Sequence, residues 1–192
     1  MTGSRPPNSS DLPDNVRGLQ CGEFERLVAL GVFEDARVEL PEGQLVEMSP
    51  QGDVHSTITR VLADRLCRAR ALAAGMILQQ HSSLRAGTFS MPEPDIAVIP
   101  RLRGFHHPSE AFLVIEVADS SLRNDREIKA GIYARAGVGE YWIIDVPHER
   151  VEVFTQPGPT SYGSIRVVER GGLLRPVALP ELELAVDAIF DC

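Results

Sequence analysis

The most apolar stretch of the chain is AFLVIEVA, residues 111–118, in which Glu116 is the one charged residue. A nearly continuous apolar run of this length is typical of a central strand buried on both faces of a sheet. Two more strands are expected before it, over 76–84 and 94–99, separated by a loop rich in Gly, Ser, Met and Pro. The pattern therefore places a sheet in the middle of the chain.

Helices are expected on either side of these strands, over 21–32, from Asp53 onward, and over 125–136. Asp53 is of the residue type that caps a helix N-terminus. The apolar face of its helix has spacings of three and four and comprises Val54, Ile58, Val61, Leu62 and Leu66. Gly75 and Gly137 stand where glycine commonly ends a helix.

Alternation of polar and apolar residues predicts two hairpins. The first spans 37–48 around Pro41-Glu42-Gly43, and the second joins 140–146 to 150–155 around Pro147-His148-Glu149. Further strands are expected over 162–168 and 175–185. Together these elements predict an α/β (α+β) fold, a mixed β-sheet flanked by helices with additional β-hairpins.

The expected domain organisation is a flexible N-terminal arm, residues 1–17, followed by a single domain over 18–192. The arm is rich in Pro, Ser, Asn and Asp and has no apolar period. It also lacks the apolar stretch of a signal peptide, and the chain has no run of about 18 apolar residues that would span a membrane. Three widely spaced cysteines form neither a metal motif nor a disulfide framework, which suits the cytoplasm.

The charge balance bears on possible partners. With 27 acidic and 19 basic residues the formal net charge is −8, which argues against coating nucleic acid through bulk charge. Motifs for a serine hydrolase elbow, a P-loop or a dinucleotide site are absent from the sequence. A locally organised acidic site that holds a cation remains compatible with this composition.

Glu116 is the informative anomaly, because an ionised carboxylate inside an apolar strand must be paired, protonated or bound to a metal. The alternative is a solvated residue at the strand end. Asp95 opens the strand over 94–99, and the two carboxylates would converge if the strands are neighbours. Close carboxylates need a proton or a cation between them, and Mg²⁺ favours such oxygen-rich sites. Asp95 alone could equally be a turn residue after Pro94.

Two more residues are candidates from their position. Lys129 lies in the helix after the Glu116 strand, on a face that holds Ile128 and Ile132, although most helix lysines are solvated. Glu39 lies between Val38 and Leu40 in the first hairpin. Periodicity alone favours a polar, outward-facing position for Glu39.

Three segments resemble the Uma-type family of putative restriction endonucleases. They are ELPEGQLVEMSP at 39–50, PDIAV at 94–98, and the ordered block that joins LVIEVADSS at 113–121 to DREIKAGIYARAGVGEYWIID at 125–145. The resemblance extends over roughly residues 20–190, and the last block is its most specific part. The family is similar to a branch of the PD-(D/E)XK nuclease superfamily, which implies a restriction-endonuclease-like core and metal-dependent phosphodiester cleavage.

The resemblance implies roles for individual residues. Asp95 matches the Asp of the PD motif and Glu116 the acidic residue of the next strand. Ala118 stands where the simplest pattern has lysine, and Lys129 on the following helix fits the displaced lysine. Glu39 matches an N-terminal acidic position. His55 matches a frequent family histidine, with a polar helix-start residue as the alternative.

These matches define the expected mechanism. Asp95, Glu116 and the backbone carbonyl of Val117 would hold Mg²⁺ (or Mn²⁺), which polarises a phosphoryl oxygen and activates water. Lys129 would orient that water or stabilise charge on the phosphate, and Glu39 would complete the metal shell or hold a second ion.

The expected substrate is nucleic acid, DNA before RNA, with no membrane partner. A homodimer would serve double-strand cleavage. Two alternatives remain open at this point, a non-catalytic interaction module that keeps the fold and a hydrolase of another phosphate ester.

Overall fold

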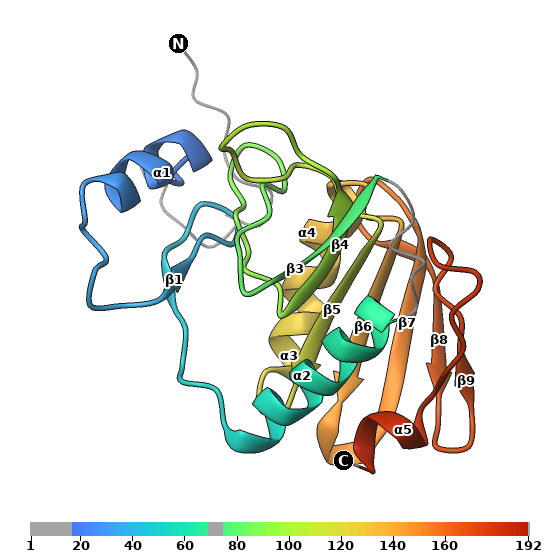
Figure 1. The fold of residues 1–192 in the computed structure, drawn as a ribbon. Helices are drawn as coiled ribbons and strands as arrows, with labels where there is room; N and C mark the ends of the chain where they lie inside the picture. Colours follow the sequence, from blue (N-terminus) through green and yellow to red (C-terminus); the bar gives the residue numbers. More distant parts are fainter. Residues whose placement is uncertain (1–16, 69–74, 192) are drawn as a thin grey trace.

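A six-stranded sheet forms the centre of the computed structural model, which describes residues 17–68 and 75–191 (Figure 1). Its strands lie side by side in chain order: β3 (Met76–Gln80), β4 (Ile96–Pro100), β5 (Leu113–Ala118), β6 (Glu140–Asp145), β7 (Arg150–Pro157) and β8 (Tyr162–Val168). Strands β5 and β6 are parallel and all other neighbours are antiparallel. The predicted mixed sheet flanked by helices is confirmed.

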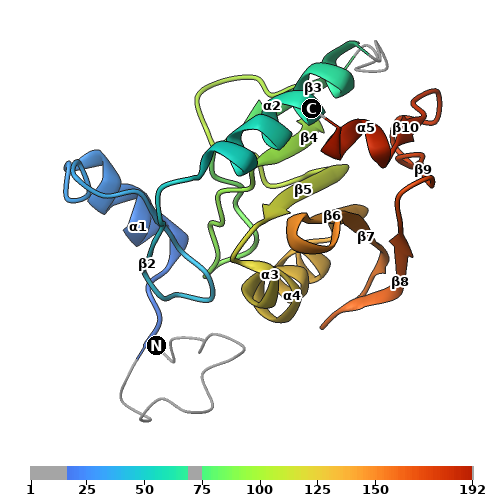
Figure 2. The same ribbon diagram turned by 90° about the horizontal axis from the view of Figure 1, so that it is seen from below.

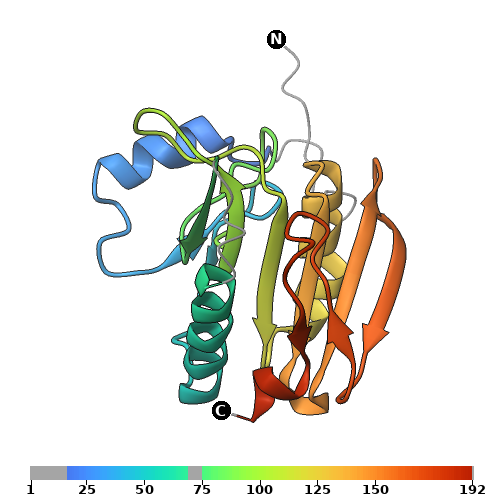
Figure 3. The same ribbon diagram turned by 45° about the vertical axis from the view of Figure 1, so that its right-hand side comes forward.

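Helices cover both faces of this sheet (Figures 2 and 3). On one face lie α2 (Asp53–Arg68) and α5 (Asp187–Phe190). On the other lies the connection between β5 and β6, which consists of α3 (Leu122–Asn124), the π-helical turn η1 (Asp125–Lys129) and α4 (Ala130–Arg135). A parallel pair needs such a crossover, because a tight turn cannot join two strands that run in the same direction.

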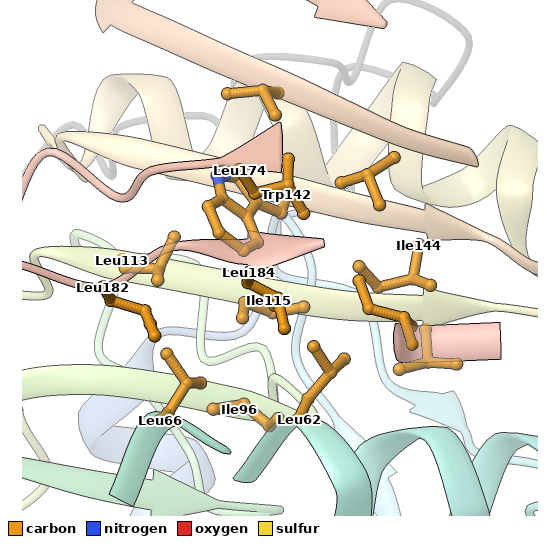
Figure 4. Close-up of a cluster of buried hydrophobic side chains, with 14 of the residues drawn as sticks. Leu62, Leu66, Ile96, Leu113, Ile115, Trp142, Ile144, Leu174, Leu182 and Leu184 are labelled. Carbon is orange, nitrogen blue, oxygen red and sulfur yellow. The ribbon is translucent and has the colours of Figure 1, made fainter. Parts of the chain in front are cut away.

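Alternate residues of each strand supply two hydrophobic cores. The core under α2 and α5 contains odd-numbered β5 residues such as Ile115 and the fully buried Trp142 of β6 (Figure 4). The core under α4 contains Val114 and Ala118 of β5, together with Tyr133 and Tyr141. Strand β5 is therefore buried on both faces, as its apolar run predicts.

A smaller unit at one end of the sheet carries the first hairpin. It comprises α1 (Cys21–Ala29), β1 (Val38–Glu39) and β2 (Val46–Glu47), and the two strands pair antiparallel. Leu40 exchanges two backbone hydrogen bonds with Met91, at 3.1 and 2.7 Å, which attaches the hairpin to the segment before β4. The hairpin thus brings its acidic residues to the sheet.

The second half of the chain differs from expectation in one place. The strand predicted over 175–185 is wrong for most of its length, because only β10 (Leu184–Ala185) is extended there, paired with β9 (Leu173–Leu174). Pro176 and Pro180 interrupt the segment, and proline cannot donate a ladder hydrogen bond. The short η2 (Val146–His148) forms the turn between β6 and β7 as predicted.

Both N-terminal helices differ in detail from the prediction. The first helix stops at Ala29, before Gly31, whose φ of 74° lies in the left-handed region that glycine favours. On α2, Val54 is 54% exposed, so the buried face begins at Ile58 instead. The predicted arm lies outside the described residues except for Arg17, and so does the segment 69–74 that precedes Gly75.

None of the described helices is long and apolar enough to cross a membrane.

The corrected face of α2 can be tested with two substitutions on one helix. Leu62→Ala removes a fully buried side chain and should lower the free energy of unfolding by about 2–5 kcal/mol. Val54→Ala, at an exposed position, should change it by less than about 0.5 kcal/mol. Urea unfolding followed by the fluorescence of Trp142 measures both, and equal effects would contradict the assigned face.

Candidate functional site

Asp95 and Glu116 lie on paired segments of the sheet. Strands β4 and β5 are antiparallel with Ile96 opposite Ile115, so Asp95 and Glu116 occupy the next positions of the same ladder. Alternate residues of a strand face the same side, so Asp95 lies on the side of Ala97 and Glu116 on the side of Val114. Both of these neighbours belong to the core under α4. The condition for convergence of the two carboxylates, neighbouring strands, is therefore met.

Glu116 is only 4% exposed and is held by two donors. Its Oε1 accepts hydrogen bonds from the Lys129 ammonium at 3.1 Å and from the Tyr133 hydroxyl at 2.7 Å. Burial raises the pKa of Glu116 well above that of an ordinary glutamate. Lys129 opposes this shift, whereas the neighbouring Asp95 adds to it.

Lys129 is 6% exposed and bridges two carboxylates. Its Nζ lies 3.1 Å from Glu116 Oε1 and 3.2 Å from Glu39 Oε2. Burial alone would lower the pKa of this lysine, but the surrounding carboxylates, Glu116 first, outweigh burial and raise it. The ammonium is therefore charged at any physiological pH.

Glu39 reaches this cluster from the first hairpin. Periodicity favoured an outward position, but Glu39 is buried and its Oε2 also accepts a hydrogen bond from the Glu93 backbone N–H at 3.3 Å. The expectation of a solvated residue is wrong because the hairpin strand is only two residues long and docks on the segment before β4. Alternation of polar and apolar residues over so short a strand does not show which face of the strand is covered by another segment.

Asp95 is held by donors from three parts of the chain. Its Oδ2 accepts the Val117 backbone N–H at 2.8 Å and lies 3.0 Å from His55 Nε2, while Oδ1 accepts the Gln51 amide at 3.1 Å. The His55 side chain is 12% exposed. Within the described residues, its Nδ1 is the one buried side-chain nitrogen or oxygen without a hydrogen-bond partner. His55 thus contacts the predicted site directly.

Three residues of the site were not predicted from sequence. Asp125 is buried beside Lys129 and accepts a hydrogen bond from Ser121 Oγ at 2.5 Å, and burial raises its pKa. Tyr133 donates to Glu116, and Gln51 to Asp95. The helical segment carries Asp125, Lys129 and Tyr133 at intervals of four. This spacing, counted from the predicted Lys129, is the sequence signal that could have identified Asp125 and Tyr133.

One cavity of about 390 Å³ is lined by Gln51 and Asp125 together with the carboxylates and the lysine described above. One wall is formed by residues 46–52 and His55, and another by residues 119–121 together with Asn124 and Asp125. All the site residues predicted from sequence line this cavity: Glu39, His55, Asp95, Glu116, Val117 and Lys129.

The charges in the cavity favour a cation. Four buried carboxylates, those of Glu39, Asp95, Glu116 and Asp125, line the cavity together with the single ammonium of Lys129. Across residues 17–68 and 75–191, no group of three His, Cys, Asp or Glu side chains forms a ready metal shell. Mg²⁺, however, commonly takes only one or two carboxylates and completes its shell with water and phosphate oxygens. The donor set therefore fits Mg²⁺ or Mn²⁺ better than it fits a metal that needs a full protein cage.

Comparisons with known proteins give the family and the fold of the chain. The family model Uma2, described as putative restriction endonuclease, matches residues 21–187. A solved structure, that of a putative nuclease belonging to DUF820 from Anabaena variabilis ATCC 29413, superposes with a TM-score of 0.72 at 18% sequence identity. The match covers 90% of this chain and 98% of that one, and it shows a shared fold. A search of curated proteins finds no match.

The raised pKa of Glu116 leads to a prediction about stability. A carboxyl whose pKa is higher in the folded state stabilises the fold below its unfolded pKa, near 4.5, and this stabilisation is lost as the pH rises through the folded pKa. Glu116→Gln keeps an acceptor for Lys129 and Tyr133 but cannot ionise. We expect E116Q to match the parent near pH 4 and to unfold at a higher temperature than the parent at pH 8.

Thermal unfolding across this pH range, followed by circular dichroism, measures the difference. Glu47→Gln is the control, because Glu47 is an exposed carboxylate on the wall of the same cavity. If E116Q were less stable than the parent at pH 8, the ionised Glu116 would be a stabilising partner of Lys129 and the raised pKa would be wrong.

Proposed function

Since the chain belongs to the Uma2 family of putative restriction endonucleases, we propose that its buried acidic site hydrolyses phosphodiester bonds in nucleic acid. The observation that carries this proposal is the pair of carboxylates, Asp95 and Glu116, which stand opposite each other on neighbouring segments of the sheet, with a buried lysine bound to Glu116. The proposed cofactor is Mg²⁺ or Mn²⁺, and DNA is the proposed substrate.

The cation would be held by Asp95, Glu116 and the carbonyl of Val117. In an extended strand the N–H and C=O of one residue point to the same side. Because the Val117 N–H donates to Asp95, its carbonyl also points toward Asp95. The register of β4 and β5 continues to Pro94 opposite Val117, and proline has no N–H to occupy that carbonyl. This arrangement supports a third oxygen ligand from the backbone.

A bound Mg²⁺ or Mn²⁺ supplies a Lewis acid that polarises a phosphoryl oxygen and lowers the pKa of water. The protein contributes fixed groups around it. Lys129 is charged and oriented, so its ammonium can direct the attacking water or stabilise charge that develops on the phosphate. Glu39, expected from sequence to join the metal shell, contacts Lys129 and is proposed to keep the ammonium at the cavity.

Gln51 and His55 are proposed to orient Asp95. Both contact its carboxylate from the wall of the cavity, and such outer partners of a metal ligand fix its direction and strengthen its binding. His55 is therefore assigned a supporting role in place of direct contact with the cation.

The electrostatics of the whole chain bear on how the substrate binds. With a net charge of −8, the protein should bind nucleic acid weakly without a divalent cation, and its affinity should fall steeply with salt. A homodimer, which would place two sites on a duplex, remains part of the proposal.

Cleavage assays test the proposed function directly. Plasmid, single-stranded DNA and RNA are incubated with the protein and Mg²⁺, Mn²⁺ or EDTA. We expect cleavage to require the cation and to fall by at least about 100-fold in Asp95→Asn and in Glu116→Gln. Loss of an outer partner of a metal ligand costs up to about 100-fold in activity, and loss of a ligand itself should cost at least as much. Asp64→Asn, an exposed change on α2, is the matched control and should retain activity.

Calorimetric titration with Mn²⁺ separates the outcomes. Binding that depends on Asp95 and Glu116 without cleavage of any of the three nucleic acids would favour a hydrolase of another phosphate ester. Absence of both binding and cleavage would favour a non-catalytic module. Undiminished cleavage by the double variant D95N/E116Q would show that the assigned carboxylates are not the site.

A further inference from the structure

Tyr133 has an unusual partner for a fully buried tyrosine. Its side chain is 0% exposed and packs against Tyr141, with ring centroids 4.9 Å apart. Its hydroxyl donates to Glu116 Oε1 at 2.7 Å. A buried tyrosine hydroxyl needs an acceptor, and a backbone carbonyl is sufficient, as Tyr162 shows by donating to Val138 O at 2.9 Å. Tyr133 instead binds the carboxylate at the centre of the site.

The π-helical turn η1 connects Asp125 to Lys129, and the first turn of α4 places Tyr133 four residues after Lys129. In a regular α-helix a step of four residues overshoots one turn by about 40°. The Ala130 N–H reaches back five residues to Asp125 O, which widens the turn between Asp125 and Lys129 and reduces the overshoot of that step. Asp125, Lys129 and Tyr133 therefore form one buried row toward the site.

The two donors determine which oxygen of Glu116 remains available. A carboxylate oxygen has two lone pairs, and Oε1 already accepts one hydrogen bond from Lys129 and one from Tyr133. Within the described part of the chain no donor contacts Oε2. The carboxylate is thus held at one oxygen and available at the other.

We propose that Tyr133 is a positioning residue for the reaction: its hydroxyl and Lys129 together fix Glu116 Oε1, so that Oε2 alone is presented to the cation. This inference rests on the proposed function, in which Glu116 is a cation ligand. It assigns the tyrosine a role that it performs through Glu116, without contact with the substrate.

The test compares two variants that each remove one buried tyrosine hydroxyl. Tyr133→Phe removes the donor to Glu116, and Tyr162→Phe removes the donor to a backbone carbonyl away from the cavity. Mn²⁺ affinity is measured by calorimetry on the full chain, and kcat and KM are measured with the nucleic acid that the cleavage assays identify as the best substrate. For Y133F we expect about 10- to 100-fold weaker Mn²⁺ binding and a similar loss in kcat, with KM for nucleic acid unchanged.

Y162F is expected to lose stability without loss of Mn²⁺ affinity or kcat. The inference is overturned if Y133F binds Mn²⁺ and turns over like the parent, or if Y162F shows the same losses as Y133F. Failure of the proposed function gives a different result, since the parent would then bind no Mn²⁺ or would bind it equally well after Glu116→Gln.

A second measurement keeps the test decisive if Y133F does not fold. Incorporation of 3-fluorotyrosine makes each phenol a stronger donor while the ring packing is retained. Tyr141 and Tyr162 donate to the backbone carbonyls of Asp125 and Val138, so of the three tyrosines only Tyr133 contacts a site carboxylate. A shift in Mn²⁺ affinity supports the inference, and an unchanged affinity overturns it.

Discussion

The cost of placing the Glu116 carboxylate in a strand buried on both faces is the constraint on which the rest of the site depends. A charge in that position must be compensated, because its hydration is lost. Compensation comes from the helix that immediately follows the strand, through the Lys129 ammonium and the Tyr133 hydroxyl. The parallel pairing of β5 and β6 requires a crossover helix at this point, so the topology of the sheet and the chemistry of the site have one common origin.

Lys129 connects parts of the molecule that are distant in sequence. It contacts Glu116 from the sheet and Glu39 from the N-terminal hairpin, while Asp125 lies beside it on its own helix. One cation among several carboxylates leaves an excess of negative charge in a small volume. A divalent cation would offset that excess, which supports the proposed metal-dependent chemistry although the chain as a whole is acidic.

Local signals in the sequence predicted much of the central sheet and several residues of the site. The apolar run identified β5, the charged residue within it identified Glu116, and the step from Pro94 to Asp95 identified the neighbouring strand. Contacts made by tertiary packing were not accessible in this way. The burial of Glu39 depends on a hairpin that docks on a distant segment, and the role of Tyr133 depends on how the crossover helix packs over Glu116. The prolines at 176 and 180 outweighed the strand propensity around them.

The attachment of the first hairpin has a consequence for how the site assembles. Glu116 and Lys129 are joined by a short connection and can meet as soon as β5 and its helix form. Glu39 must be brought in from a remote part of the chain, and closing that longer loop costs more entropy. The two ion pairs of Lys129 therefore differ in the loop entropy that each requires: the pair with Glu116 is local, and the pair with Glu39 is long-range and needs the hairpin that the Leu40–Met91 bridge attaches. An undocked hairpin would leave the lysine with one of these two acidic partners, Glu116.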